Sequence, residues 1–487
     1  MNAPKSACLF LLAALLLASC DSFLEVEPED RIDSPSFFSN DQELLIGVNG
    51  VYAAQRGIYG NGSVFNIIEG RADNAGFDHT DQAERVETDI FTESPGNLLV
   101  DLTWASMYNA INLANTVIAR GPEASGDATR INRIVGEAKF IRAFTYFHMV
   151  NLWGGVPLRT TPTDDFENAA LARSSPDEVY TLIVQDLTEA SSALPPSYDG
   201  SVGNEAGRVT RFAALTLLGK VELQRGNASA AVAALRQVEG QYSLLPDFGA
   251  IHAAGNDNTA ESIFEVNFNP ANQTGLGRTG LVPNSVAVEL GIVAGGATRE
   301  ILFPFATQDL IDAFDDPADL RIPHTFGTAD GVEPGGYISK FIDLAAASAG
   351  ADINLVLLRY ADVLLSLAEA LGEGGEAYAL INQVRARAGL PDIDANTPGT
   401  FMEKVMKERR LEFAFETHRW FDLLRLPQSE TLAIMNAQLN AQQTFFAQHP
   451  NYNGPTQFNL TSDDLLYPIP QLEIDISGGV VVQNPGY

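Results

Sequence analysis

The stretch "INRIVGEAKFIRAFTYFHMVNLW", residues 131–153, decides the fold class of this chain. After Phe140, apolar residues occupy nearly every face of it, whereas a helix on a protein surface carries an apolar stripe on one side only. Gly154, Gly155 and Pro157 follow directly and end the run, because glycine favours helix C-termini and proline cannot continue a helix. The stretch therefore predicts a long helix that other helices bury on all sides.

Helical periodicity recurs in several further blocks. In the block from Leu102 to Ala119, Trp104 and Tyr108 lie four residues apart, and Gly121 followed by proline ends the run. The other blocks span residues 175–194, 210–225, 228–239, 355–371, 375–388 and 401–424. The sequence thus predicts a mostly α-helical protein.

Two helix pairs share one spacing of packing residues. In the pair over residues 210–239, Gly219 and Ala231 fall where a tetratricopeptide repeat needs small residues, and Gly226 turns the corner. In the pair over residues 355–388, the same frame places Ala368 at a crossing and Gly375 at the corner. The spacing predicts tetratricopeptide-like packing, and two ordinary antiparallel helix pairs remain the alternative.

Long polar or glycine-rich stretches separate the helices, at residues 56–95, 241–300 and 317–352. Within the second, "SIFEVNF", residues 262–268, alternates Phe264, Val266 and Phe268 with Glu265 and Asn267. This pattern predicts a short strand with one buried face. A rigid helical frame that presents long loops is suited to recognition of a ligand.

The chain begins with a leader-like segment. An apolar run from Leu9 to Leu17 follows Lys5, and it is shorter than the about 20 residues that a membrane-spanning helix needs. It predicts a secretory signal peptide over residues 1–19. "LASC", residues 17–20, resembles the bacterial lipobox and predicts diacylation of Cys20. A signal peptide that merely contains a cysteine is the alternative.

Cysteine usage also favours lipid anchoring. The second cysteine, Cys8, belongs to the leader, so the mature chain would carry Cys20 alone and no disulfide. Each buried acyl methylene contributes about 0.8 kcal/mol, so two or three acyl chains hold a protein on a membrane without a spanning helix.

The composition is strongly acidic. There are 62 Asp and Glu against 30 Lys and Arg, and the formal net charge is −32. Such a surface repels nucleic acid and anionic lipid, so we expect neither as a partner. Only 6 of the basic residues are lysines. A salt-rich source is one hypothesis for this balance, and an acidic protein from an ordinary habitat is the other.

Motifs for cofactors and catalysis are weak. "GLGRTG", residues 275–280, has the glycine spacing of a dinucleotide loop, but six residues separate it from the predicted strand and no clear helix follows. The histidines show no local metal-ligand spacing, and no G-x-S-x-G elbow occurs. The six histidines are His79, His148, His252, His324, His418 and His449. We therefore expect no cofactor and no locally encoded zinc site.

The densest polar cluster is "KERRLEFAFETHRWFDLLR", residues 407–425. On a continuous helix, Glu412, Glu416 and Arg419 share one face, and Asp422 lies three residues from Arg419 and from Arg425. This spacing favours a ladder of ion pairs beside an apolar strip. Paired carboxylates for acid–base catalysis are the alternative.

Seven motifs, in order, resemble the SusD/RagB family of nutrient-binding outer-membrane lipoproteins. They are the lipobox with "FLEVEP" (23–28), "WASMYNAINLANTVI" (104–118), "GEAKFIRAFTYFHMVNLWGGVPL" (136–158), "LLRYADVLLSLAEAL" (357–371), "INQVRARAGLP" (381–391), "ERRLEFAFETHRWFDLLR" (408–425), and the terminal "YPIPQLEID" and "QNPGY" (467–475, 483–487). Trp104, Tyr108, Trp153 and Trp420 match positions that are structural in that family.

The resemblance implies one SusD-like binding domain over residues 20–487. Its tetratricopeptide-like scaffold would span about 40–240 and 355–425, and a loop-rich ligand lobe would span about 241–354 with 56–95. It further implies no catalysis, a lipid anchor in the outer membrane facing the cell exterior, and capture of an oligosaccharide or a peptide. The ligand would pass to a SusC-like TonB-dependent barrel. A surface glycoside hydrolase and a tetratricopeptide adaptor for a protein partner are the alternatives.

Loops that correspond to the family's recognition surface supply the candidate ligand residues. These are Arg71, Asp73, Asn74, Phe77, His79, Phe268, Asn269 and Tyr337. None is a tryptophan, so we expect a weak stacking platform and leave oligosaccharide and peptide both open.

Overall fold

The structure is a computed structural model of the chain. It describes residues 37–60, 63–77, 82–163, 170–198, 205–268, 304–327, 336–341, 353–447 and 454–487. The signal peptide over residues 1–19, Cys20, the "GLGRTG" loop, His79, Asn269 and His449 lie outside these ranges. Within them, no helix combines the length and the apolar character needed to cross a membrane.

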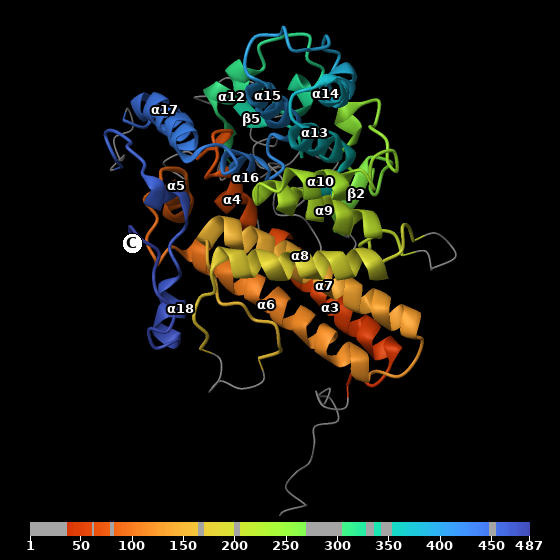
Figure 1. Cartoon of the computed structure of the whole chain (residues 1–487). Coiled ribbons are helices and arrows are strands. Elements are labelled where there is room, and N and C mark those ends of the chain that lie inside the picture. The colour runs from red at the N-terminus through yellow and green to blue at the C-terminus, as the bar shows by residue number, and fades with distance from the viewer. Residues whose placement is uncertain are drawn as a thin grey trace, which may run out of the picture.

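The protein is built from two groups of helices (Figure 1). In the lower group, α3 (Asp41–Gly60), α6 (Leu98–Arg120), α7 (Ala128–Trp153) and α8 (Pro176–Ala193) lie side by side. Above them lie α9 (Arg211–Gln224), α10 (Ala228–Leu235), α13 (Tyr360–Leu371) and α14 (Gly375–Arg387). Packing runs in series from α7 to α8, α9, α10, α13 and α14. This tetratricopeptide-like stack confirms the predicted fold class.

Helix α7 is the central element, as its sequence predicts. Asp127 caps its first turn by accepting hydrogen bonds from the backbone N–H groups of Thr129 and Arg130. Every residue from Phe140 to Trp153 is buried, and Gly154 ends the helix with φ of 72°. The helix is enclosed because α3, α6 and α8 all pack against it.

The first repeat pair packs as the spacing predicts, and the second differs at its corner. A Cβ atom on Gly219 would lie 2.5 Å from Cγ of Leu235, so α9 and α10 cross closely only because no side chain intervenes. Gly226 turns between them with φ of 75°. In the second pair, Gly372, with φ of 72°, makes the turn, whereas Gly375 begins α14.

Three of the predicted helices are shorter than their periodicity indicates. The block over residues 228–239 is helical only as far as Leu235, the end of α10. Residues 355–359 form strand β6 (Leu355–Arg359), because they pair with β2 (Ser262–Val266) and are buried on both faces. The block over residues 401–424 divides into α15 (Phe401–Phe413) and α16 (Arg419–Leu423). Phe415 and Thr417 have φ of 67° and 62°, which no α-helix contains.

The predicted loop over residues 56–95 contains α4 (Ser63–Glu69) and α5 (Ala83–Asp89). The remaining helices are α12 (Gln308–Ala313), α17 (Gln428–Phe446) and α18 (Gln471–Ile476). Short 3₁₀ turns occur at Gly121–Glu123, Phe248–Ala250, Ile322–His324 and Ser462–Leu465. The C-terminal segment packs along the N-terminal half of the chain, where the N–H of Gln471 donates to the carbonyl of Pro95.

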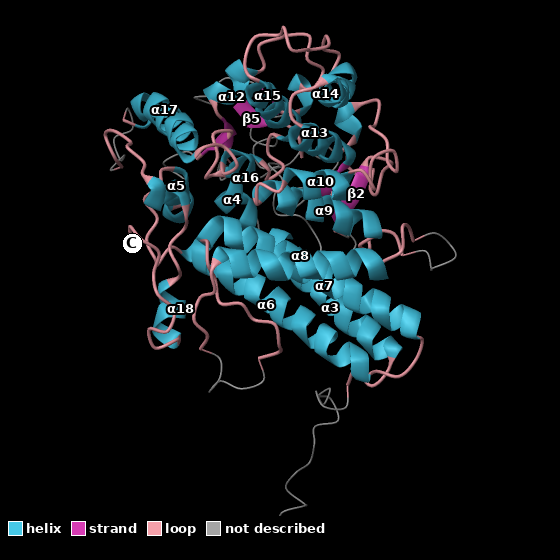
Figure 2. Cartoon of the chain, viewed as in Figure 1, coloured by secondary structure: helices cyan, strands magenta, loops and turns pink. Residues whose placement is uncertain are grey.

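The strands form two small antiparallel sheets (Figure 2). One pairs β2 with β6, and the other has the order β1 (Ala75–Gly76), β3 (Phe305–Ala306), β5 (Gly336–Ile338) and β4 (Phe326–Gly327). Phe264, Val266 and Phe268 are buried, which confirms the predicted inner face of β2. Glu265 is buried as well, because Asn354 covers the face that the alternation predicts to be exposed.

The polar cluster over residues 407–425 holds buried ion pairs, some within the cluster and others with partners from distant segments. Glu412 pairs with Arg321, Arg359 and Arg387. Glu416 pairs with Lys340 at 2.7 Å and with Nε of Arg359 at 2.7 Å. Two further pairs in this cluster are Asp422 with Arg409 and Asp422 with Arg425, each at 2.9 Å.

Candidate functional site

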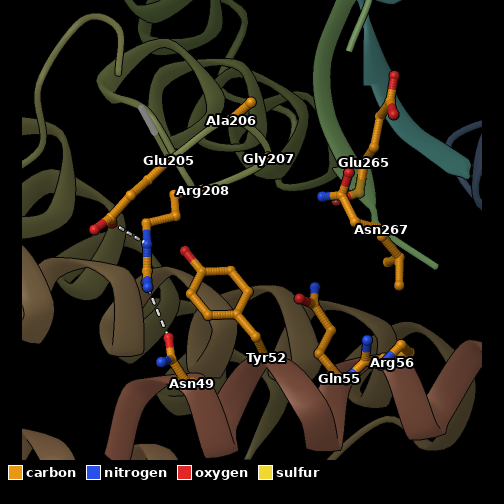
Figure 3. Close-up of a pocket in the computed structure, with 11 residues that line it drawn as sticks. Asn49, Tyr52, Gln55, Arg56, Glu205, Ala206, Gly207, Arg208, Glu265 and Asn267 are labelled. Atoms are coloured by element: carbon orange, nitrogen blue, oxygen red, sulfur yellow. Dashed lines mark hydrogen bonds and ion pairs between the residues drawn. The ribbon is translucent and has the colours of Figure 1, made fainter. Parts of the chain in front are cut away.

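A cleft of about 400 Å³ opens between α3, the segment over residues 205–208 and the end of β2 (Figure 3). Its lining comprises Asn49, Tyr52, Gln55, Arg56, Glu205, Ala206, Gly207, Arg208, Glu265, Val266 and Asn267. A second hollow of about 230 Å³ shares Ala206, Gly207, Arg208 and Glu265 with the cleft. The shared lining makes the second hollow a side groove of the cleft.

Helix α3 forms the floor of the cleft. Asn49, Tyr52, Gln55 and Arg56 lie at positions i, i+3, i+6 and i+7, so helical geometry puts all four on one face. The ring of Tyr52 stands in the middle of the cleft (Figure 3), and its hydroxyl accepts a hydrogen bond from the backbone N–H of Val209 at 3.0 Å. The floor therefore presents one aromatic face beside two amides and a guanidinium.

Arg208 fixes one wall. Its Nη1 donates to Glu137 at 2.7 Å, its Nη2 donates to Asn49 at 2.7 Å, and it also pairs with Glu205. Its guanidinium lies 5.5 Å from the ring centroid of Tyr52. Burial raises the pKa of Glu137, while the Arg208 guanidinium opposes that rise. Arg208 is thus paired with carboxylates of the protein itself.

The opposite wall is a set of amides around Glu265. Asn354 donates from Nδ2 to Glu265 at 2.9 Å and to Asn267 at 2.7 Å, and the backbone N–H of Asn258 donates to Glu265 at 2.9 Å. Burial raises the pKa of Glu265. Gly207 has φ of 88°, and a Cβ there would lie 2.1 Å from Nδ2 of Asn267, so glycine is what lets the two walls meet.

Two donors in the cleft have no partner within the described residues. Nε2 of Gln55 makes no hydrogen bond although the residue is only 3% exposed, and Figure 3 shows its amide directed into the cleft. Nε of the partly buried Arg56 makes none either. A buried donor without a partner costs about 1–3 kcal/mol. The cleft is therefore complementary to a ligand rich in oxygen acceptors.

The chemistry of the cleft is that of binding. It offers a tyrosine face, three amide side chains and two guanidinium groups, which suit the faces and hydroxyl edges of sugar rings. No group of three or more His, Cys, Asp or Glu side chains in the described part of the chain is arranged to hold a metal ion.

A separate hollow of about 330 Å³ lies between α15 and α17. Met402, Met406, Leu426 and Ile434 supply its apolar lining, and it contains no aromatic side chain. Its chemistry suits a sugar ring less well than the cleft does.

Four of the candidate ligand residues lie in the interior, away from the cleft. Arg71 is fully buried, pairs with Glu93 at 2.5 Å and lies 4.1 Å from the ring centroid of Tyr467. Phe77 is also fully buried, and its backbone N–H donates to Asp89 at 2.8 Å.

Asp73 and Asn74 are likewise buried and partnered. The carboxylate of Asp73 accepts two hydrogen bonds of 2.7 Å from Arg419. Burial opposes its ionisation, but the guanidinium groups of Arg410 and Arg419 hold its pKa well below the usual range. Nε of Arg410 donates to Asn74 at 2.8 Å. Side chains enclosed in this way present no surface to a ligand in this structure, so a ligand role for Arg71, Asp73, Asn74 and Phe77 stays a prediction.

The other candidates lie apart from that group. Phe268 is buried one residue beyond Asn267 of the cleft, and its N–H donates to Asn354 at 2.8 Å. Tyr337 is partly buried in β5 and packs over Gly327. Of the candidate ligand residues predicted from the sequence, Phe268 thus lies next to the cleft, and none belongs to its lining. The available signal was the polar face of α3, where Asn49, Tyr52, Gln55 and Arg56 recur at helical spacing.

Comparisons with known proteins point to SusD-like binding proteins. A family model described as the SusD family matches residues 328–487, and one described as starch-binding and associating with the outer membrane matches residues 22–223. SusD-like protein P2 of Formosa agariphila is 27% identical, over 98% of this chain and 99% of that protein.

Solved structures share the fold. A laminarin-binding SusD-like protein has a TM-score of 0.76 and 28% identity, over 92% of this chain and 100% of that chain. Surface glycan-binding protein A from Bacteroides fluxus has a TM-score of 0.74 at 22% identity, over 92% of this chain and 100% of that chain. The second likeness bears on the fold alone.

Proposed function

The chain belongs to the SusD/RagB family, and from this premise we propose that it captures an oligosaccharide at the outer membrane, without catalysis, and delivers it to a SusC-like TonB-dependent barrel. The observation that carries the binding role is the cleft on α3, where Tyr52 offers a ring face and Gln55 offers an amide donor with no described partner. Planar faces flanked by donors are the usual means of holding sugar rings.

The relatives support a glycan over a peptide. The laminarin-binding protein is 28% identical to this chain and shares its fold over nearly the whole length. A peptide ligand in an extended form would pair with an exposed strand edge. Residues 265–267, at the end of β2, line the cleft together with α3 and residues 205–208. The cleft instead offers side-chain donors and a ring.

Anchoring and delivery rest on the N-terminal sequence and on the family. A diacylated Cys20 would attach the mature chain to the outer membrane facing the exterior, and residues 21–36 would link it to the fold. Cys20→Ser should move the protein from the membrane fraction to the soluble fraction. Mild detergent extraction of the native membrane should recover the unaltered protein together with a barrel, and recovery of the protein alone would contradict delivery.

Calorimetric titration of residues 21–487, which include every described residue, tests the binding role. We expect saturable binding to at least one member of an oligosaccharide panel, and weaker binding by Tyr52→Ala. The control is Tyr337→Ala, since Tyr337 lies outside the cleft. If the Tyr337 variant loses binding while the Tyr52 variant binds as the unaltered protein does, the site lies in the loops and not in the cleft.

A glycoside hydrolase is the second candidate, because Glu205 and Glu265 line the same cleft and burial raises the pKa of Glu265. Both carboxylates are engaged: Glu205 pairs with Arg208, and Glu265 accepts hydrogen bonds from Asn258 and Asn354. Incubation with the same panel decides between the two functions, since a binding protein releases no shorter products.

A further inference from the structure

The charge on Arg56 is unusual for this protein. Acidic residues outnumber basic ones by 62 to 30, and the cleft's other arginine, Arg208, pairs with Glu137 and Glu205. Arg56 forms no ion pair with any residue that the structure describes, and its Nε lacks a hydrogen-bond acceptor. It is nevertheless partly buried on the floor of the cleft. A guanidinium that is partly removed from water without a counter-charge is costly, and an anion in the cleft would offset that cost.

Gln55 supplies an independent observation next to it. Its side chain is 3% exposed, its Nε2 has no partner among the described residues, and its amide points into the cleft (Figure 3). Gln55 and Arg56 are consecutive on α3 and line the same cleft. Together they offer several N–H donors to one small region, which matches a group that carries two or three oxygen acceptors.

The other charged groups that face the cleft do not cancel Arg56. Glu205 is neutralised by Arg208 and lies 3.8 Å from Arg133. Glu265 accepts hydrogen bonds from Asn258 and Asn354, and it forms no ion pair with Arg56 among the described residues. Among the described residues that line the cleft, Arg56 is therefore a cation that no carboxylate pairs with.

We propose that the cleft selects oligosaccharides that carry an anionic substituent, a carboxylate or a sulfate ester, with Arg56 pairing to the anionic group and Gln55 donating to an adjacent oxygen. The inference rests on the proposed function and names its ligand class. Guanidinium is suited to this task, because its planar N–H fork matches carboxylate and sulfate oxygens. The net charge of −32 repels such ligands at a distance, but this repulsion is screened beyond about 10 Å at 0.1 M salt.

The test is calorimetric titration of residues 21–487 at 0.15 M NaCl with three hexasaccharides: a laminarin fragment, which is neutral, a galacturonate oligomer, which carries carboxylates, and a carrageenan fragment, which carries sulfates. We expect one anionic probe to bind at least about tenfold more tightly than the neutral one, since a hydrogen bond to a charged group contributes about 1.5–3 kcal/mol. The probe that binds identifies the substituent.

Arg56→Gln should weaken binding of the preferred anionic probe by roughly 10- to 100-fold and leave the laminarin fragment unaffected. Arg211→Gln is the control, because Arg211 is exposed, lies outside the cleft and donates to the carbonyl of Ser191. Arg56→Lys keeps the charge and should retain part of the affinity.

Three outcomes would overturn the proposal. If the laminarin fragment binds as tightly as both anionic probes, or if Arg56→Gln weakens all probes equally, the ligand class is wrong while glycan binding stands. If no probe of a wider neutral and anionic panel binds, the proposed function itself fails.

Discussion

Asp89→Asn offers a quantitative test of how Phe77, in the stretch over residues 56–95, is held. Asp89 is 2% exposed, and its Oδ2 accepts a hydrogen bond from the N–H of Phe77 at 2.8 Å. No described cation pairs with it, so burial raises its pKa from 3.8 to about 8. Asparagine keeps the acceptor and cannot ionise. The substitution therefore isolates the effect of the buried proton.

The sign follows from comparing the folded and unfolded chains. Between about pH 4 and pH 8 the unfolded chain has lost the proton of Asp89, while the folded chain keeps it. The free energy of unfolding consequently falls as the pH rises through this window, by up to about 1.4 kcal/mol per pH unit from this residue. Over the whole window the loss of stability from Asp89 amounts to about 6 kcal/mol at most, and the asparagine variant does not suffer it.

Urea unfolding followed by tryptophan fluorescence at pH 5, 6, 7 and 8, at constant ionic strength, measures the difference. We expect the variant to be more stable than the unaltered protein by an amount that is smallest at pH 5 and grows toward pH 8. Glu69, whose pKa burial also raises to about 8, contributes equally to both proteins and cancels. A stability difference that does not change with pH, or a variant that is less stable at pH 8, would refute the reasoning.

Two further substitutions test the scaffold by thermal unfolding. Glu412→Gln should lower the free energy of unfolding by about 3–5 kcal/mol, because three buried arginines lose their shared carboxylate, and a loss below about 1 kcal/mol would contradict a structural role for the cluster. Gly219→Ala should cost about 1–3 kcal/mol, because its Cβ would press on Leu235. Gly375→Ala is its control, since no atom lies within 4 Å of a Cβ there, and equal losses from both would contradict close packing of α9 on α10.

The parts of the fold that sequence predicts well are those that depend on local pattern. Helix α7 is enclosed on all sides, so its apolar character on every face is itself the signal. The break between α15 and α16 has no such signal. Glu412 and Glu416 bond to Arg359, which lies more than fifty residues earlier, and the N–H of Thr417 donates to Glu69 at 2.5 Å. These distant partners override the helical propensity of the segment.

The cleft could not be predicted from local sequence pattern for a similar reason. Its residues come from 49–56, 205–208 and 265–267, and only the fold brings these segments together. The stretch from Arg71 to Phe77 carries the polar and aromatic residues expected of a binding loop. Ring and carbonyl groups of the C-terminal segment, including Tyr467, cover Arg71 instead. A polar loop that looks free in the sequence is thus buried by a segment almost 400 residues away in the chain.

Hydrogen–deuterium exchange of residues 21–487, with and without the oligosaccharide that binds most tightly in the panel, tests the central claim most directly. A ligand held in the cleft should slow exchange in the peptides that contain residues 49–56, 205–208 and 265–267, and should leave the peptides that contain residues 71–77 and 336–338 unchanged. Slower exchange confined to residues 71–77 and 336–338, with the cleft peptides unaffected, would contradict the account.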